Sequence, residues 1–158
     1  MSLVVTTALI FYALGMALVF GGTAALSFAA APQIFRNLPP YDAGKVFGKT
    51  LRVFDAMSSY ASLVAVVAGV AGMAVKFSAA GVARVVLAAS VYTVVTLLRK
   101  SVAPQMAALK PPETADEERT WDPEKRKAFD VLHKQYVRLY SANLFSSLAA
   151  LVLCALPA

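Results

Sequence analysis

The sequence predicts an all-α integral membrane protein: a four-helix bundle made of two tandem helical hairpins, with helices that extend beyond the membrane on the cytoplasmic side. Hydrophobic residues make up 59% of the 158 residues and charged residues only 15%, a balance unlike that of a water-soluble domain. Four long segments carry almost no charge, and a proline-containing motif occurs twice, 72 residues apart. The length suits one compact bundle, so residues 1–158 are expected to form a single four-span domain.

The expected spans are residues 3–35, 56–75, 79–98 and 139–156. A helix needs about 20 residues to cross the hydrocarbon core of a bilayer, and each segment is close to that length or longer. Pro32 lies near the end of the first span, and Pro104 follows the third. Because proline has no backbone N–H and its ring meets the carbonyl four residues earlier, we expect both prolines to break the helix.

The connection between the first two spans contains a short basic segment. Asp42 is a plausible N-cap for a helix that begins there. Lys45, Lys49 and Arg52 then follow at helical spacing and share one face. Such a helix suits the headgroup layer, where these three side chains would contact anionic lipid. The same residues also fit the solvated beginning of the second span.

Further along the chain, Ser78–Gly81 predicts a tight turn between the second and third spans. Arg84 lies in the first turns of the third span, and we expect its side chain to extend to the membrane surface. The stretch Lys110–Pro123 reads as a polar loop. At its end, Asp122 predicts an N-cap, with Pro123 at the first helical position.

The charges predict the orientation. Of the 15 basic residues, 13 lie in or beside the connections between spans one and two and between spans three and four, as do all nine acidic residues. These basic residues are Arg36, Lys45, Lys49, Arg52, Arg99, Lys100, Lys110, Arg119, Lys125, Arg126, Lys127, Lys134 and Arg138. The positive-inside rule then places both connections in the cytoplasm and both termini outside, in the cell (inner) membrane. Because acidic residues are interspersed with the basic ones, we expect no binding to nucleic acid.

The repeated motif suggests a duplicated hairpin. Ala31-Pro32-Gln33 is followed by Pro39-Pro40, and Ala103-Pro104-Gln105 is followed by Pro111-Pro112. Two spans per unit would relate the hairpins by an axis along the membrane normal. The same offset maps polar residues of the last helix onto small or apolar residues of the second: His133, Tyr136, Tyr140 and Asn143 onto Ala61, Val64, Ala68 and Ala71.

A polar stripe on the last helix is the candidate site. His133, Tyr136, Tyr140, Asn143 and Ser147 are spaced so that all five lie on one helical face. In a membrane protein such a face should line a wet cavity or pack on other helices. We predict a ligand cleft formed by the first four of these residues, which faces Gln33 or Gln105 beside the two prolines.

Several short motifs occur together in order: Ala31-Pro32-x-x-Phe35, Leu38-Pro39 followed by Ala43-Gly44, Pro104, and Phe129-x-x-Leu132-His133. Over nearly the whole chain, this combination resembles the transmembrane-protein-205-like family, small four-span membrane proteins also described as a domain of unknown function. The resemblance implies a polytopic membrane protein. It carries over His133 and Pro32, whereas Tyr136 and Tyr140 replace a small polar residue and an asparagine of the family pattern.

These observations favour a non-enzymatic protein that binds or transports a small molecule or lipid through the cleft, or that scaffolds a membrane complex. A scaffold would be a homo-oligomer or bind a membrane partner through an exposed face of small residues, Ala61, Ala65 and Gly69. The alternative is a membrane oxidoreductase, or a metal- or haem-binding protein that uses His133. One histidine and one cysteine offer few ligands, so we predict no metal site and no cofactor. His133 would otherwise bind a loop carbonyl and order the cytoplasmic end of the bundle.

Overall fold

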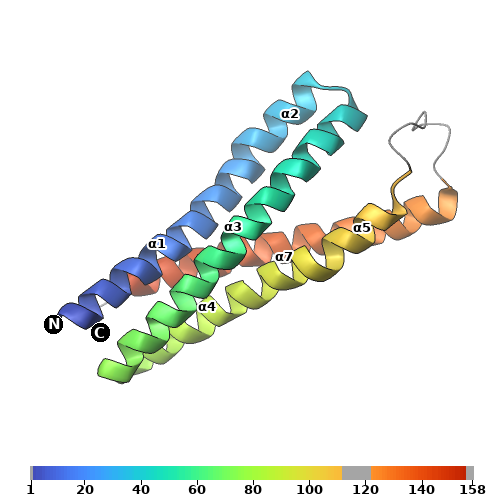
Figure 1. The fold of residues 1–158 in the computed structure, drawn as a ribbon. Helices are drawn as coiled ribbons and strands as arrows, with labels where there is room; N and C mark the ends of the chain where they lie inside the picture. Colours follow the sequence, from blue (N-terminus) through green and yellow to red (C-terminus); the bar gives the residue numbers. More distant parts are fainter. Residues whose placement is uncertain (1, 112–121, 156–158) are drawn as a thin grey trace.

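The computed structural model describes residues 2–111 and 122–155, which form one elongated bundle (Figure 1). Its α-helices are α1 (Leu3–Ala25), α2 (Ala31–Asn37), α3 (Pro40–Val75), α4 (Ala79–Leu97), α5 (Ala103–Leu109) and α7 (Pro123–Ala155). Two π-helical segments, η1 (Leu26–Ala30) and η2 (Leu98–Val102), join α1 to α2 and α4 to α5. The result is four continuous helical segments, each long and apolar enough to cross a membrane, which confirms the predicted all-α class and the four spans.

The helices are longer than the predicted spans. The basic segment that precedes the second span belongs to the same helix as the span itself, because α3 runs without interruption from Pro40 to Val75. The third helical segment continues past residue 98 to Leu109. The predicted end of the fourth span at residue 156, and most of the predicted polar loop at 110–123, lie outside the described residues.

The four helical segments pack in a ring. α1 and α4 each pack on both α3 and α7, so α3 and α7 lie diagonally across the bundle. Both chain ends lie at one end of the bundle (Figure 1). At the opposite end, α2 packs on α3 and α5 packs on α7, and the two pairs diverge. This divergence creates the space in which the candidate site lies.

The outer surface of the bundle is apolar. In the most hydrophobic window of each helical segment, at most a third of the residues are buried inside the protein. Large side chains such as Leu14, Val67, Val86 and Phe145, one from each segment, point outward. The exposure of so much apolar surface to water would be unfavourable, whereas lipid tails would cover this surface. The chain is therefore a membrane protein.

Small residues let α1 approach α3 closely. A Cβ atom added to Gly15 would lie 2.5 Å from the carbonyl oxygen of Ala61 and 3.1 Å from the Cβ of Ala65. Ala65 is fully buried, and Gly69 lies beside Tyr12. The prediction that Ala61, Ala65 and Gly69 form an exposed face for another chain is therefore wrong, because α1 already covers these residues.

The predicted breaks at Pro32 and Pro104 take the form of π-helical turns. Since Pro32 cannot donate to the carbonyl four residues earlier, the helix widens over η1, and the Ala31 N–H reaches the carbonyl of Leu26. The second proline follows η2, where Ala103 makes the equivalent bond to Leu98. The helix thus changes its hydrogen-bond pattern and continues through each proline.

The helix ends differ in how well the sequence predicted them. Asp122 accepts a 2.9 Å hydrogen bond from the Glu124 N–H, which confirms it as the cap before Pro123. Ser78 likewise caps α4 by accepting from the Gly81 N–H at 3.0 Å. Asp42 is not an N-cap. The helix begins two residues earlier, at Pro40, because a proline needs no N–H partner at the first helical position.

Candidate functional site

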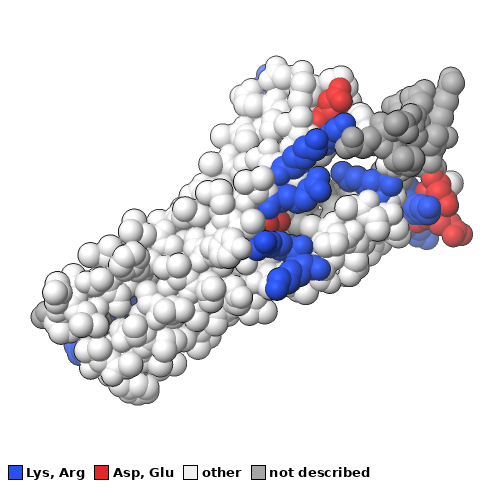
Figure 2. Space-filling view, in the orientation of Figure 1, with Lys and Arg blue, Asp and Glu red and all other residues white. Residues whose placement is uncertain are grey.

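A cleft of about 680 Å³ separates the α2–α3 pair from the α5–α7 pair at the end remote from the termini. Its walls carry both cations and apolar side chains. The cations are Lys45, Lys49 and Arg52 of α3 and Lys110 after α5. The apolar members include Phe35, Phe47, Met106 and Phe129. Figure 2 shows the Lys and Arg side chains gathered around this hollow, while the opposite part of the visible face is almost uncharged.

The spacing of α3 explains the cationic wall. Positions 45, 49 and 52 recur at i, i+4 and i+7, so the helix presents all three side chains on one side. The structure directs that side into the cleft, whereas the sequence suggested only a basic face at the headgroup layer. The α3 wall of the cleft therefore carries three cationic side chains.

Asp55 and Tyr136 form the floor of the cleft. The Tyr136 hydroxyl donates a hydrogen bond of 2.9 Å to Oδ2 of Asp55. Both residues line the cleft, yet they are only 3% and 7% exposed. Arg99 of η2 also acts electrostatically on the Asp55 carboxylate. A buried carboxylate needs such partners, because an uncompensated charge is strongly unfavourable away from water.

His133 lies at the mouth of the cleft. Its ring stacks on Phe129, with centroids 6.0 Å apart and an interplanar angle of 5°. Lys110 Nζ lies 5.7 Å from the centroid of the same Phe129 ring. Within the described residues His133 makes no hydrogen bond, so the expected bond to a loop carbonyl is not seen there. The side chain is exposed and available to a ligand in the cleft.

The structure separates Gln33 and Gln105 from the rest of the predicted site. Both side chains are exposed, and neither lines the cleft. The Asn37 amide donates to the backbone carbonyl of Gln33 at 2.8 Å, and Gln105 donates to Ser101 at 3.1 Å. Each glutamine thus interacts with its own helix. The π-helical turns before the prolines shift the helical register, which a strict 3.6-residue period does not predict.

The other predicted residues lie deeper in the bundle. The rings of Tyr136 and Tyr140 stack with centroids 5.8 Å apart. Asn143 and Ser147 are buried, and Ser147 donates to the Asn143 carbonyl at 2.8 Å. The predicted stripe therefore divides into an exposed histidine, a tyrosine at the cleft floor, and three residues inside the bundle.

Five buried polar residues of this region escaped prediction: Asp55, Thr23, Ser58, Ser59 and Ser62. The sequence did contain an indication of Asp55, because this residue is an isolated acid directly before a 20-residue uncharged stretch. It contained none of the four hydroxyl residues, because small hydroxyl residues are common in membrane helices and often bond to their own backbone.

The pairing of Asp55 with Tyr136 corrects the predicted mapping between the hairpins. α3 and α7 run in the same direction (Figure 1), and this pair fixes an offset of 81 residues between them. At that offset Asn143 lies at the level of Ser62, and Tyr140 at the level of Ser59. The offset of 72 fails here because two residues separate α2 from α3, whereas 13 residues separate α5 from α7. Polar residues of α7 thus lie level with polar residues of α3.

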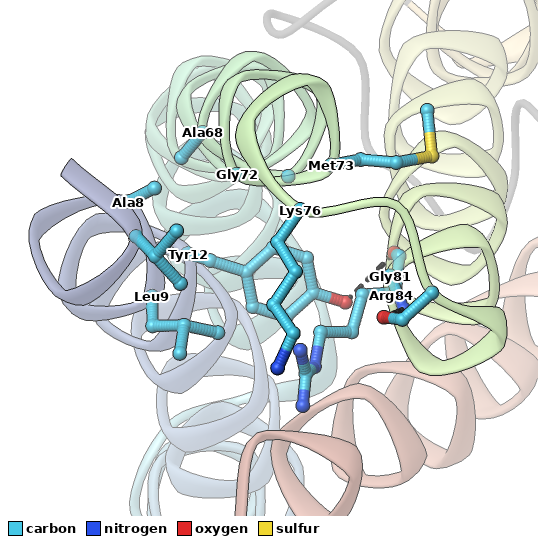
Figure 3. A pocket seen from close by; sticks show the side chains of 12 residues that line it. Ala8, Leu9, Tyr12, Ala68, Gly72, Met73, Lys76, Gly81 and Arg84 are labelled. Carbon is cyan, nitrogen blue, oxygen red and sulfur yellow. Dashed lines mark hydrogen bonds between the residues drawn. The ribbon is translucent and has the colours of Figure 1, made fainter. Parts of the chain in front are cut away.

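A second, small cavity of about 30 Å³ lies near the chain termini (Figure 3). The Tyr12 hydroxyl donates to the Arg84 carbonyl at 2.8 Å. The Arg84 guanidinium donates to the Leu153 carbonyl through Nε at 3.2 Å and Nη2 at 2.9 Å. Arg84 is only 5% exposed, so the prediction that it extends to the membrane surface is wrong. Carbonyls in the last turn of a helix lack donors within the helix, and Arg84 supplies one.

The chemistry of the two sites differs. In the described part of the chain, no three His, Cys, Asp or Glu side chains come together in a way that could hold a metal ion. The small cavity is large enough for about one water molecule, and the Arg84 hydrogen bonds beside it hold the end of α7. The large cleft combines a cationic rim with aromatic and aliphatic walls, which suits a ligand that has an anionic head and an apolar body.

No curated protein and no solved structure shows a significant match to this chain. Residues 14–113 match the profile of a protein family that is described as a domain of unknown function, DUF4149. The matched region includes the cationic wall and Asp55 but ends before α7. The match gives no support to the narrower resemblance to the transmembrane-protein-205-like proteins. The chain belongs to the DUF4149 family.

Proposed function

We propose that this protein is a non-enzymatic membrane protein that binds one anionic amphiphile, a phospholipid with a negatively charged headgroup, in the cleft between the two helix pairs. The observation that carries the proposal is the direction of the α3 cations. Lys45, Lys49 and Arg52 line the inside of the cleft, where a bound headgroup would contact all three.

The chemistry of the cleft supports this ligand class. Lysine and arginine bind phosphate through charge-assisted hydrogen bonds, and arginine can do so with two parallel bonds. Phe35, Phe47 and Met106 provide apolar surface in the same cleft for the first part of an acyl chain. Among the residues that the structure describes, Asp55 is the one acid that lines the cleft, and it already accepts a hydrogen bond from Tyr136 at the floor, away from the rim.

The charge distribution supports a cytoplasmic location for the cleft. Among the 14 basic residues that the structure describes, only Lys76 and Arg84 lie toward the end that carries the termini, and the other 12 lie toward the end that contains the cleft. The positive-inside rule favours an orientation in which the cleft faces the cytoplasm. The cytoplasmic leaflet, which the cleft would then face, is also the leaflet that is rich in anionic headgroups.

A duplicated hairpin would explain the shape of the cleft. The two π-helical turns are exactly one repeat offset apart, since η1 begins at Leu26 and η2 at Leu98. α2 and α5 are both seven residues long and both contain proline in the first turn. In a tandem repeat each unit would supply one diverging pair, α2 with α3 and α5 with α7.

Binding fits the described conformation better than passage across the membrane. Below the cleft the bundle is closed by a buried apolar cluster that includes Tyr12, Met16, Val19 and Val91. A ligand that entered the cleft would therefore stop at the level of the polar residues above this cluster. Transport would require a second conformation in which the cluster separates.

Lipid titration of the purified protein in a non-ionic detergent, followed by native mass spectrometry, tests the proposal. Phosphatidylglycerol should bind with one lipid per chain, and phosphatidylcholine should bind far more weakly. Replacing Lys45, Lys49 and Arg52 together by alanine should weaken binding about a hundredfold, since each basic residue near an anionic headgroup contributes about 1 kcal/mol.

A matched variant controls for net charge. Lys125, Arg126 and Lys127 begin α7, are exposed and do not line the cleft. Their triple replacement by alanine removes the same three charges and should change the binding of phosphatidylglycerol by less than about threefold. Equal losses in both triple variants would show general surface attraction and would refute a specific cleft.

A further inference from the structure

Directly below the floor of the cleft, four buried oxygen atoms have no hydrogen-bond partner within the described part of the chain. They are Thr23 Oγ1, Ser58 Oγ, the Tyr140 hydroxyl oxygen and Asn143 Oδ1. Thr23 is 0% exposed, Ser58 1% and Asn143 2%. Buried polar atoms are almost always hydrogen-bonded, so four unpartnered oxygens in one region point to a site for an ordered water molecule or an ion.

These oxygens come from three helices that meet at nearly the same level. Ser58 lies one turn below Asp55 on α3, and Tyr140 lies one turn below Tyr136 on α7. Since Asp55 bonds to Tyr136, Ser58 and Tyr140 lie at adjacent levels. The Thr23 side chain of α1 and the Tyr140 hydroxyl are close enough to interact as hydrogen-bonding groups, although the pair falls outside strict hydrogen-bond geometry. Asn143 lies one further turn below.

We infer that this cluster binds one monovalent alkali cation, and that the Asp55 carboxylate above it supplies the negative charge without coordinating the ion. Every unpartnered atom is an oxygen, and oxygen ligands suit hard cations. The unpartnered atom of Asn143 is its carbonyl oxygen, which can only accept or coordinate. Asp55 is the one acid among the buried residues that the structure describes, which matches one positive charge and not two.

The surroundings fit a cation. Arg99 acts on the same carboxylate, but its guanidinium carbon lies 5.7 Å above the Tyr60 ring, and Arg99 itself remains partly exposed. Beneath the cluster lies the apolar core, with Val19 fully buried. The site is therefore closed below and reached from the cleft above. It lies deeper than the cationic rim, and its oxygens belong to residues other than those proposed to bind a lipid.

Thermal unfolding of the full chain in detergent tests this site, in NaCl, KCl or N-methyl-D-glucamine chloride at equal ionic strength. The organic cation is too large for the cluster. At tenfold excess over the dissociation constant, Na⁺ or K⁺ should raise the Tm by about 3 °C or more. Thr23→Val and Asn143→Leu should abolish this rise, and Ser58→Ala, the smallest change, should reduce it.

The same variants distinguish loss of binding from loss of folding. In the organic salt, Thr23→Val should unfold at or above the wild-type temperature, because it removes an unpartnered buried hydroxyl without changing shape. Thr93→Val is the control: Thr93 donates to the Ala89 carbonyl at 2.8 Å on an exposed face of α4. It should keep the full response to Na⁺. Identical wild-type Tm values in all three salts, or an undiminished response in Thr23→Val, would show that the cluster holds water only and would overturn the inference.

Discussion

The Tyr136 hydroxyl donates a hydrogen bond of 2.9 Å to the Asp55 carboxylate and so joins two helices that lie diagonally across the bundle. α3 and α7 have few other contacts, because α1 and α4 lie between them. The pair also separates two environments. Above it lies the cationic cleft, and below it lie the buried oxygens of Thr23, Ser58, Tyr140 and Asn143.

Tyr136→Phe should lower the free energy of unfolding by about 1.5–3 kcal/mol, because it removes a hydrogen bond to a buried charged group. Asp55→Asn removes the charge. Adding Tyr136→Phe to Asp55→Asn should therefore lower the free energy of unfolding by less than Tyr136→Phe does in the wild type. A double-mutant cycle of chemical unfolding in mixed micelles measures this coupling. Tyr60→Phe, at an exposed tyrosine, is the control and should change the free energy of unfolding by less than about 0.5 kcal/mol. Fully additive effects of the two changes would mean that the bond contributes nothing to stability.

The helices and their approximate ends were predictable because the signals are local. Uncharged stretches of about 20 residues marked the four spans, and Asp122 before Pro123 marked the start of α7. The polar face of α7 was also visible from helical spacing, and Tyr136 and His133 do line the cleft. These features depend on residues within one or two helical turns of one another.

The partners across the bundle were not predictable in the same way. Asp55 meets a residue 81 positions later, and this offset depends on the length of the connection between α5 and α7. Arg84 was assigned to the surface because charges in membrane helices usually extend toward water. The free carbonyl of Leu153 gives it a buried partner instead. Gln33 and Gln105 were misplaced because the π-helical turns rotate the residues that follow them.

Gly15→Ala should destabilise the protein by about 2 kcal/mol or more. The added Cβ would lie 2.5 Å from the Ala61 carbonyl oxygen, so α1 and α3 would have to separate along a close contact. Gly21→Ala on the same helix is the matched control, since a Cβ there would meet nothing within 4 Å. It should raise stability by about 0.5–1 kcal/mol through helix propensity. Thermal unfolding of both variants in one detergent gives the comparison. A similar Tm for the two would mean that α1 does not approach α3 as closely as the structure shows.

Arg84→Met should loosen the end of α7 without opening the cleft. The change removes both hydrogen bonds to the Leu153 carbonyl, one of the last four carbonyls of α7, which have no donor within the helix. Amides of residues 150–155 should exchange with deuterium about tenfold faster, as for a loss of about 1.4 kcal/mol of local stability. Tyr12→Phe removes only the bond to the Arg84 backbone carbonyl and should leave this exchange unchanged. Unaltered exchange in Arg84→Met would contradict the role of Arg84 as a cap.

Labelling of single cysteines should show both termini outside the cell and the cleft inside. In a Cys154→Ala background, Leu3→Cys places a thiol at an exposed position beside the N-terminus, and Asn37→Cys places one at the exposed end of α2. The membrane-impermeant maleimide should label position 3 in intact cells and position 37 only after the membrane is made permeable. This outcome follows from the positive-inside rule, since 12 of the 14 basic residues that the structure describes lie toward the end of the bundle that contains Asn37. The reverse labelling pattern would turn the cationic cleft toward the outer leaflet, where anionic lipid is scarce, and would remove the electrostatic reason for lipid binding at this site.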